Sequence, residues 1–110
     1  MAALIIFSQG AIMKKIQKKK LLKTAKQAIQ AAVASGPAPD TATDDPELKR
    51  HCGCFVTIKN DERLRGCLGQ FTSDKPVIEL IAKMARDSAT SDPRFFSDPV
   101  TADELDQLDI

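Results

Sequence analysis

Apolar side chains recur at helical spacing in two stretches of the chain. Residues three and four apart share one face of an α-helix, so this spacing predicts amphipathic helices. The first stretch, residues 12–34, is followed by turn formers, and its apolar stripe is Leu22, Ala25, Ile29, Ala32 and Val33. The second, residues 76–90, has Asp74 in position for an N-cap, and its apolar face is Ile78, Ile81, Ala85 and Ser88, supported by Val77 and Met84.

Between these helices, residues 51–71 have the period of a β-hairpin. A two-residue loop would mix apolar and charged side chains on both faces. A three-residue loop, Asn60-Asp61-Glu62, separates them, with Ile58 facing Leu64, Val56 facing Gly66 and Cys54 facing Leu68. Because a slip of one residue inverts every side chain, we predict this second register. Its third loop position needs a left-handed backbone, so Glu62 is expected to carry strain.

The remaining segments are predicted to be loops and one short helix. Residues 35–46 lack periodicity, and residues 91–99 form a structured loop. Thr101 and Glu104 have the spacing of a capping box that opens a short helix, after which residues 109–110 begin a strand. The predicted fold class is α+β: an antiparallel sheet with a central hairpin at about 51–71, covered by helices at about 12–34 and 76–90.

The amino-terminal stretch is expected to contribute little to the fold. Its apolar run, residues 2–7, is too short for a signal-peptide core or a membrane span. We therefore expect residues 1–12 to be an N-terminal extension and residues 13–110 to form one domain. Whether the extension is ordered is left open. Three cysteines without a secretion signal indicate a reducing compartment, so we expect a cytoplasmic protein with no membrane contact.

Charge is nearly balanced in total and unevenly placed. The chain has 16 Lys+Arg and 15 Asp+Glu, yet residues 1–34 hold seven lysines and no acid, while residues 87–110 hold seven acids and one arginine. This asymmetry indicates either a nucleic-acid or membrane contact or two ends that neutralise each other on folding. The chain lacks Tyr and Trp, which removes most base-stacking platforms. Nucleic-acid binding through the lysine-rich helix is therefore kept only as a weaker alternative.

The candidate chemistry centres on the strand Arg65-Gly66-Cys67-Leu68-Gly69. In the predicted register Arg65 and Cys67 share one face, and a guanidinium beside a thiol favours the nucleophilic thiolate. This predicts Cys67 as a catalytic nucleophile and Arg65 as an anion-binding partner, with Gly66 and Gly69 letting another backbone or a ligand approach closely. The alternative is structural: Cys67 is a buried apolar residue, and Arg65 pairs with an acid from a neighbouring element. The residues alone leave both open.

A second candidate cation lies in the segment Asp92-Pro93-Arg94-Phe95. Arg94 is predicted to bind a ligand carboxylate or phosphate as a bidentate donor. The alternative is that Asp92 and Arg94 pin the loop while Phe95 fills the core.

Metal binding is not predicted. The potential zinc ligands are His51, Cys52, Cys54 and Cys67, and their spacing is poor for a zinc site. In the predicted register Cys54 and Cys67 also face opposite sides of the sheet. No phosphate-binding loop, zinc-protease motif or nucleophile elbow is present, so no cofactor is predicted, and whether the protein is an enzyme is left open.

Five segments, in this order and spacing, resemble the AMMECR domain family, which includes the prokaryotic AmmeMemoRadiSam system protein A. They are LLKTAKQAI (21–29), CFVTIKNDERLRGCLG (54–69), KPVIELIAKMA (75–85), DPRF (92–95) and PVTADELDQLDI (99–110).

The resemblance implies a mixed α/β domain of unassigned activity, of which this sequence corresponds to the N-terminal portion. It also implies a Memo-like or radical-SAM protein as partner. Two functions therefore remain: a small-ligand or enzymatic site at residues 65–69, or a non-catalytic module that docks on such a partner.

Overall fold

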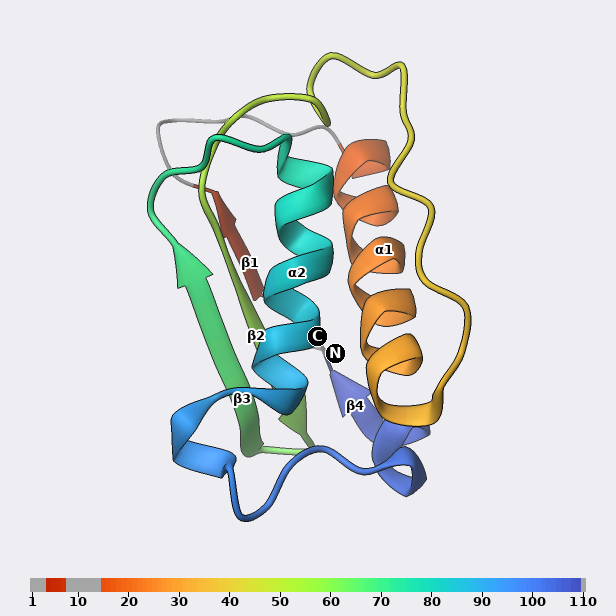
Figure 1. Cartoon of the computed structure of the whole chain (residues 1–110), viewed down its shortest axis with the longest axis vertical. Helices are drawn as coiled ribbons and strands as arrows, with labels where there is room; N and C mark the ends of the chain where they lie inside the picture. Colours follow the sequence, from red (N-terminus) through yellow and green to blue (C-terminus); the bar gives the residue numbers. More distant parts are fainter. Residues whose placement is uncertain (1–3, 8–14, 110) are drawn as a thin grey trace.

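The computed structural model describes residues 4–7 and 15–109, which form one antiparallel sheet and two long helices (Figure 1). Strand β2 is central, and β1, β3 and β4 all pair with it. The predicted α+β class is confirmed. The elements in chain order are β1 (Leu4–Phe7), α1 (Lys15–Ala34), β2 (Cys54–Asn60), β3 (Arg63–Gln70), α2 (Val77–Thr90), the 3-10 helices η1 (Pro93–Phe95) and η2 (Ala102–Gln107), and β4 (Leu108–Asp109).

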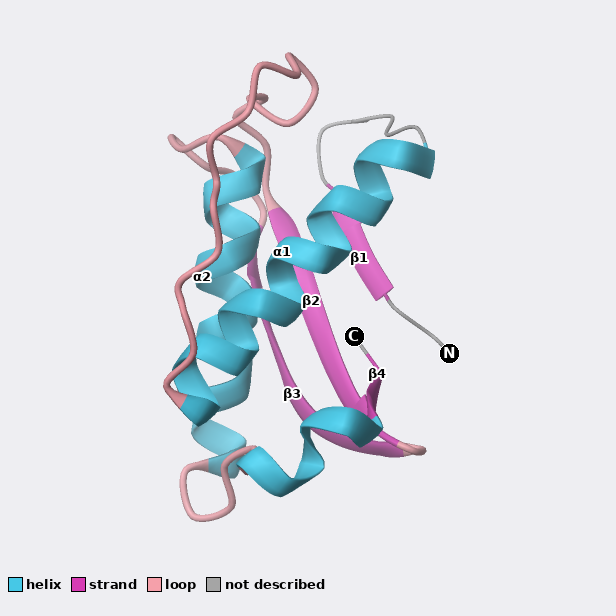
Figure 2. Cartoon of the chain, turned by 90° about the vertical axis from the view of Figure 1, so that its right-hand side faces the viewer, coloured by secondary structure: helices cyan, strands magenta, loops and turns pink. Residues whose placement is uncertain are grey.

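Both long helices cover the same face of the sheet (Figure 2). The core lies between the helices and the sheet, because the alternate β2 residues Cys54, Val56 and Ile58 are fully buried on that face. Helix α2 brings the predicted apolar face: Val77, Ile78, Ile81, Met84, Ala85 and Ser88 are all buried, together with Leu80 and Ala89. On the other face of the sheet, Figure 2 shows no helix from the described part of the chain.

The buried stripe of α1 is offset from the predicted one. Leu22 and Val33 are only partly buried and Ala32 is exposed. The residues that are buried are Gln17, Leu21, Thr24, Ala25, Ala28 and Ile29. Both stripes have helical spacing, and packing against α2 selects the second one.

Helix α2 begins without the predicted side-chain cap. Its N-cap is Pro76 rather than Asp74, and no side chain accepts from the first turn. The first N–H groups instead donate to backbone carbonyls of an upstream turn: Val77 to Arg50 at 2.7 Å and Ile78 to Leu48 at 3.2 Å. These bonds satisfy donors that a helix leaves unpaired at its start.

The hairpin differs from the predicted register. Asn60 pairs with Arg63, so the loop has two residues rather than three, and the positive φ falls on Asp61 rather than Glu62. An aspartate tolerates this conformation better than most residues, because its short side chain can hydrogen-bond locally. Beyond the turn the register shifts, and Val56 pairs with Leu68. The predicted three-residue loop and its pairs are therefore wrong.

The ends of the described chain meet on the same edge of β2. Leu4 pairs with Thr57 and Phe7 with Cys54, whereas β4 pairs with Lys59 and Asn60. The expectation that the first twelve residues contribute little to the fold thus fails for 4–7, whose Leu-Ile-Ile-Phe sequence has strong strand propensity. The rest of that stretch, 1–3 and 8–12, lies outside the described residues, as does Ile110.

No helix in the described ranges is long and apolar enough to cross a membrane.

Candidate functional site

A β-bulge in β3 decides where the Arg65 side chain lies. Leu64 pairs with Lys59 and Gly66 with Ile58, which leaves Arg65 between them without a partner residue on β2. A bulge re-aims the side chain that it leaves unpaired. Arg65 consequently reaches across to η2, while Cys67 points elsewhere, with its Sγ 3.3 Å from Thr57 Oγ1. The prediction that Arg65 and Cys67 share one face is wrong.

The Arg65 guanidinium is buried and fully engaged within the chain; its side chain is only 1% exposed. Glu104 accepts from both Nε and Nη2 at 2.8 Å, a bidentate pair. Nη1 donates to the Asp98 carbonyl at 3.1 Å and lies 3.5 Å from its carboxylate, and Nη2 donates to the Pro99 carbonyl at 2.9 Å. A guanidinium has five N–H donors, and these contacts use all of them. The geometry of Arg65 is therefore that of the structural alternative, in which this arginine pairs with an acid from a neighbouring element.

Glu104 is the acid that the alternative required. The hydrogen bonds from Arg65 hold the pKa of its carboxyl at about 2, against the opposing effect of burial, and the Asn60 amide donates to it at 3.0 Å. The same side chain accepts from the Thr101 N–H at 3.0 Å and forms the predicted capping box. One carboxylate thus joins β2, β3 and the start of η2.

The two glycines of the strand allow close packing within the protein. A Cβ on Gly66 would lie 1.8 Å from the Ser88 carbonyl oxygen, so α2 approaches β3 there more closely than any side chain permits. A Cβ on Gly69 would lie 2.4 Å from the Cys54 carbonyl oxygen and from the Phe55 ring. In this structure the space next to both backbones is filled by the chain itself. Ligand access at Gly66 and Gly69 is accordingly without support in the geometry.

Ser88 links α2 to both strands of the hairpin. Its hydroxyl oxygen accepts from the Leu68 N–H at 3.0 Å and donates to the Val56 carbonyl at 3.2 Å. A buried hydroxyl needs such partners, because an unsatisfied one costs about 1–3 kcal/mol. Together with Gly66, this serine fixes the distance between α2 and the sheet.

Cys67 is partly exposed, as are Leu68 and Gly69, whereas Arg65 and Gly66 are buried. Cys67 pairs with Thr57, on the face of the sheet opposite to the buried Cys54, Val56 and Ile58. Its backbone is held at the outer edge of β3, because its N–H donates to Asp92 Oδ2 at 2.9 Å and its carbonyl accepts from Arg94 Nη2 at 3.2 Å. The structure thus brings Arg94, rather than Arg65, next to Cys67.

Asp92 anchors this edge. Its side chain is 1% exposed, and the guanidinium of Arg94, 56% exposed, donates to it at 2.7 and 3.1 Å. Those hydrogen bonds, helped by the backbone N–H groups of Cys67 and Arg94, lower the pKa of Asp92 to about 2. Asp92 and Arg94 therefore pin the loop, as the structural alternative for this segment predicted.

Phe95 lies beside both arginines. Its ring centroid is 5.9 Å from the Arg65 guanidinium carbon and 5.6 Å from that of Arg94, within the range of cation–π attraction. The ring is only partly buried, so it packs on the two cations rather than filling the core.

The other candidate metal ligands are separated from Cys67. Cys52 and Cys54 are buried in the core, burial raises the pKa of Cys54 to about 12, and His51 is exposed. Within residues 4–7 and 15–109, no group of three or more His, Cys, Asp or Glu side chains is arranged to hold a metal ion.

Sequence reasoning missed the importance of Glu104 and Ser88. Glu104 is recognisable as a capping residue, but its bond to Arg65 spans 39 positions in the sequence. Ser88 looks like one small residue of a helix face. Neither position carries a local signal of its partner, because both bonds depend on how α2 and η2 sit against the hairpin.

Comparison with known proteins gives a consistent family. The AMMECR1 family model matches residues 22–110. A protein of Thermotoga maritima is 44% identical over 72 residues, covering 64% of this chain and 40% of its own length, and one of Methanothermobacter thermautotrophicus is 35% identical, covering 82% and 46%. The crystal structure of an uncharacterised protein from Pyrococcus horikoshii matches with a TM-score of 0.68 at 37% identity, covering 80% of this chain and 45% of that one.

The chain belongs to the AMMECR1 family. It spans less than half the length of these relatives.

Proposed function

We propose that this AMMECR1-family chain is a docking module, and that the open face of its sheet receives another polypeptide. The open face is defined by two cross-strand pairs, Phe55 with Gly69 and Thr57 with Cys67, together with Phe71, whose ring contacts Phe55. Its occupant would be the portion of the family fold that this chain does not span.

The observation that carries this proposal is the one-sided cover of the sheet. Both helices lie on one face (Figure 2), and the open face bears an aromatic pair, with the rings of Phe55 and Phe71 5.0 Å apart in an edge-to-face arrangement. Phe71 is 76% exposed. Aromatic side chains at such positions are typical of the central contacts in protein interfaces.

The length comparison supports the choice of occupant. More than half of each relative lies outside its match to this chain, including 55% of the Pyrococcus horikoshii structure. When a sheet is covered on one face only, its uncovered face is ordinarily polar. Here the uncovered face carries two neighbouring aromatic rings, which are not polar.

Co-expression tests the proposal directly. We expect this chain to co-purify with the unmatched portion of the Thermotoga maritima relative, and Phe71→Ser to weaken the association about tenfold or more. Phe96→Ser is the matched control, because Phe96 is also highly exposed, at 67%, but lies in the loop after η1. Equal effects of the two variants, or no association, would contradict the proposal.

A Memo-like or radical-SAM partner stays a prediction from the family resemblance. Co-purification with such a partner should be unchanged with Cys67→Ser, because a non-catalytic module does not need the thiol.

The second candidate function is a ligand site at Cys67 and Arg94, which keeps the thiol chemistry of the original hypothesis with a different arginine. The favouring observation is that Asp92 accepts from the Cys67 backbone N–H and from the Arg94 guanidinium, which holds a partly exposed cysteine next to an exposed cation. We expect iodoacetamide to label Cys67, whereas Cys52 and Cys54, 2% and 0% exposed, resist as internal controls. Resistance of Cys67 at every accessible pH would eliminate a nucleophilic role.

A further inference from the structure

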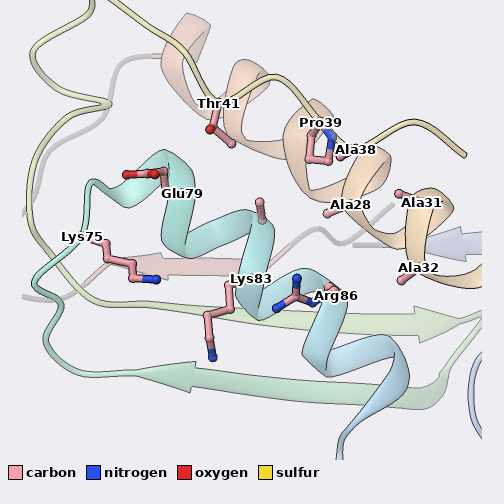
Figure 3. A pocket seen from close by; sticks show the side chains of 11 residues that line it. Ala28, Ala31, Ala32, Ala38, Pro39, Thr41, Lys75, Glu79, Lys83 and Arg86 are labelled. Atoms are coloured by element: carbon pink, nitrogen blue, oxygen red, sulfur yellow. The ribbon is translucent and has the colours of Figure 1, made fainter.

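A groove crosses the outer side of the two helices, away from the open sheet face (Figure 3). Its volume is about 480 Å³, within the range of known ligand sites. It is bounded by the second half of α1, by the loop that follows α1, and by one side of α2. The lining residues are Ala28, Ala31, Ala32, Ala38, Pro39, Thr41, Lys75, Glu79, Ala82, Lys83 and Arg86.

The groove has an apolar floor and a cationic wall. The residues from α1 and the loop are small, and no lining residue is bulky and apolar. Three cations and one acid stand along the α2 side: Lys75, Lys83 and Arg86, with Glu79. Asp87 partly neutralises two of them, with its carboxylate 3.1 Å from Lys83 Nζ and 3.4 Å from Arg86 Nε.

The positive charge continues past the loop. A neighbouring hollow of about 410 Å³ shares Ala38 with the groove and is lined by two lysines of α1, Lys20 and Lys23, and by one acid, Asp40. Helix α1 contains six lysines and no acid. This side of the molecule therefore offers a partner more cations than anions.

We propose that the groove binds an extended acidic peptide segment with small side chains between its carboxylates. Its carboxylates would accept hydrogen bonds from Lys75, Lys83 and Arg86, and its small side chains would lie on the alanines. This inference is independent of the docking surface on the sheet.

Length and composition favour a peptide over other anions. Helix α2 rises about 14 Å from Val77 to Arg86, at 1.5 Å per residue, which matches about four residues of extended chain. A compact anion would contact only one end of this row. Nucleic acid is disfavoured, because none of the lining residues is aromatic and bases would have no ring to stack on.

The test uses fluorescence anisotropy with a labelled peptide of about eight residues that alternates alanine and glutamate. Its counterpart with glutamine in place of glutamate should not bind. Lys75→Ala should weaken binding about threefold. Lys18→Ala on α1 is the matched control, because it removes the same charge from an exposed lysine that does not line the groove.

A second variant tests the cavity itself. Ala31→Leu keeps helix propensity and fills the groove, so it should weaken binding about tenfold or more. Ala34→Leu, at the end of α1 and outside the lining, should leave binding unchanged. Circular dichroism would confirm that both variants fold.

Three results would overturn the proposal. Lys18→Ala could weaken binding as much as Lys75→Ala, which would indicate diffuse attraction to the lysine-rich surface. The glutamine peptide could bind equally well. A single-stranded RNA of similar length could bind more tightly and respond to the same variants, which would assign the groove to nucleic acid.

Discussion

Two arginine–carboxylate pairs lie beside Phe95, and they differ in which partner is buried. In the Arg65–Glu104 pair the cation is buried, with 1% of its side chain exposed against 16% for the acid. In the Arg94–Asp92 pair the acid is buried, at 1%, and the cation is 56% exposed. The arginine is therefore the internal partner in the first pair, and the carboxylate is the internal partner in the second.

The difference shows which member of each pair the fold depends on. Arg65 has five N–H donors and no access to water, so it relies on Glu104 and on nearby carbonyls. Asp92 also accepts from the backbone N–H groups of Cys67 and Arg94, so it keeps partners without the Arg94 guanidinium. Removing a partner is expected to be costly only where it leaves a buried charge unpaired.

Acid should weaken both pairs and has the largest expected effect. The pKa values of Asp92 and Glu104 are lowered to about 2 from ordinary values of 3.8 and 4.5. Because the folded values are depressed, this stabilisation is fully present above about pH 5 and is lost as the pH falls toward 2. Urea midpoints measured between pH 7 and 3 should decrease in that window. A chain carrying Asp92→Asn and Glu104→Gln should show a clearly flatter dependence, and an unchanged slope would contradict the assignment.

Glu104→Ala should be the most destabilising of the single substitutions. It leaves the buried Arg65 guanidinium with only the longer, 3.5 Å contact to the exposed Asp98 carboxylate and also removes the capping-box acceptor of Thr101. The expected loss in free energy of unfolding is about 3 kcal/mol, measured by urea denaturation. Asp103→Ala is the control, since Asp103 is an exposed neighbour in η2 and should change stability by less than about 0.5 kcal/mol.

Asp92→Asn should cost less. An amide still offers one acceptor, but its NH₂ group cannot accept from the Cys67 N–H, and the charge that holds Arg94 is lost. We expect a loss of about 1–2 kcal/mol in the free energy of unfolding. Asp74→Asn, at an exposed position before α2, provides the baseline. A loss as large as that of Glu104→Ala would show that the two pairs are equivalent after all.

Arg94→Ala should have the smallest effect of the series. It removes an exposed cation and leaves Asp92 with its two backbone donors. The Arg94 side chain is 56% exposed, so water can take its place on the outer side of the carboxylate while the two backbone N–H groups continue to donate to it. The urea midpoint of this variant should therefore lie closer to that of the unchanged chain than to that of Asp92→Asn. A midpoint closer to that of Asp92→Asn would mean that the Arg94 guanidinium is needed for Asp92 to stabilise the edge of β3.

Local pattern was enough to place most elements but could not place the bulge. The two helices, the hairpin and the capping box were predicted, because 3.6-residue and two-residue periods and capping spacings are local properties. The register depended on counting residues between Ile58 and Cys67. One extra residue at Arg65 changes every pairing beyond it. Glycine inside a strand often marks a bulge, but Gly66 and Gly69 both meet that description, so the sequence does not say where the insertion lies.

The candidate site was predicted in its composition and not in its arrangement. Cys67, Arg65 and Arg94 were singled out, yet the pairing of Cys67 with Arg65 was wrong because the bulge turns Arg65 toward η2. The structural alternatives for Arg65 and for the Asp92–Arg94 pair describe the geometry better. Gly66 and Gly69 were identified as positions of close approach, but it is the chain's own backbone and Phe55 that lie close.

The amino-acid sequence by itself determined the family, the two amphipathic helices and the presence of a hairpin, because short-range periodicity and ordered motifs need no knowledge of distant contacts. Tertiary structure alone decided that Arg65 is an internal cation and that Cys67 lies beside Arg94. The reason is physical: a buried guanidinium must find a carboxylate, and the 39 positions between Arg65 and Glu104 can be bridged only when η2 packs against the hairpin.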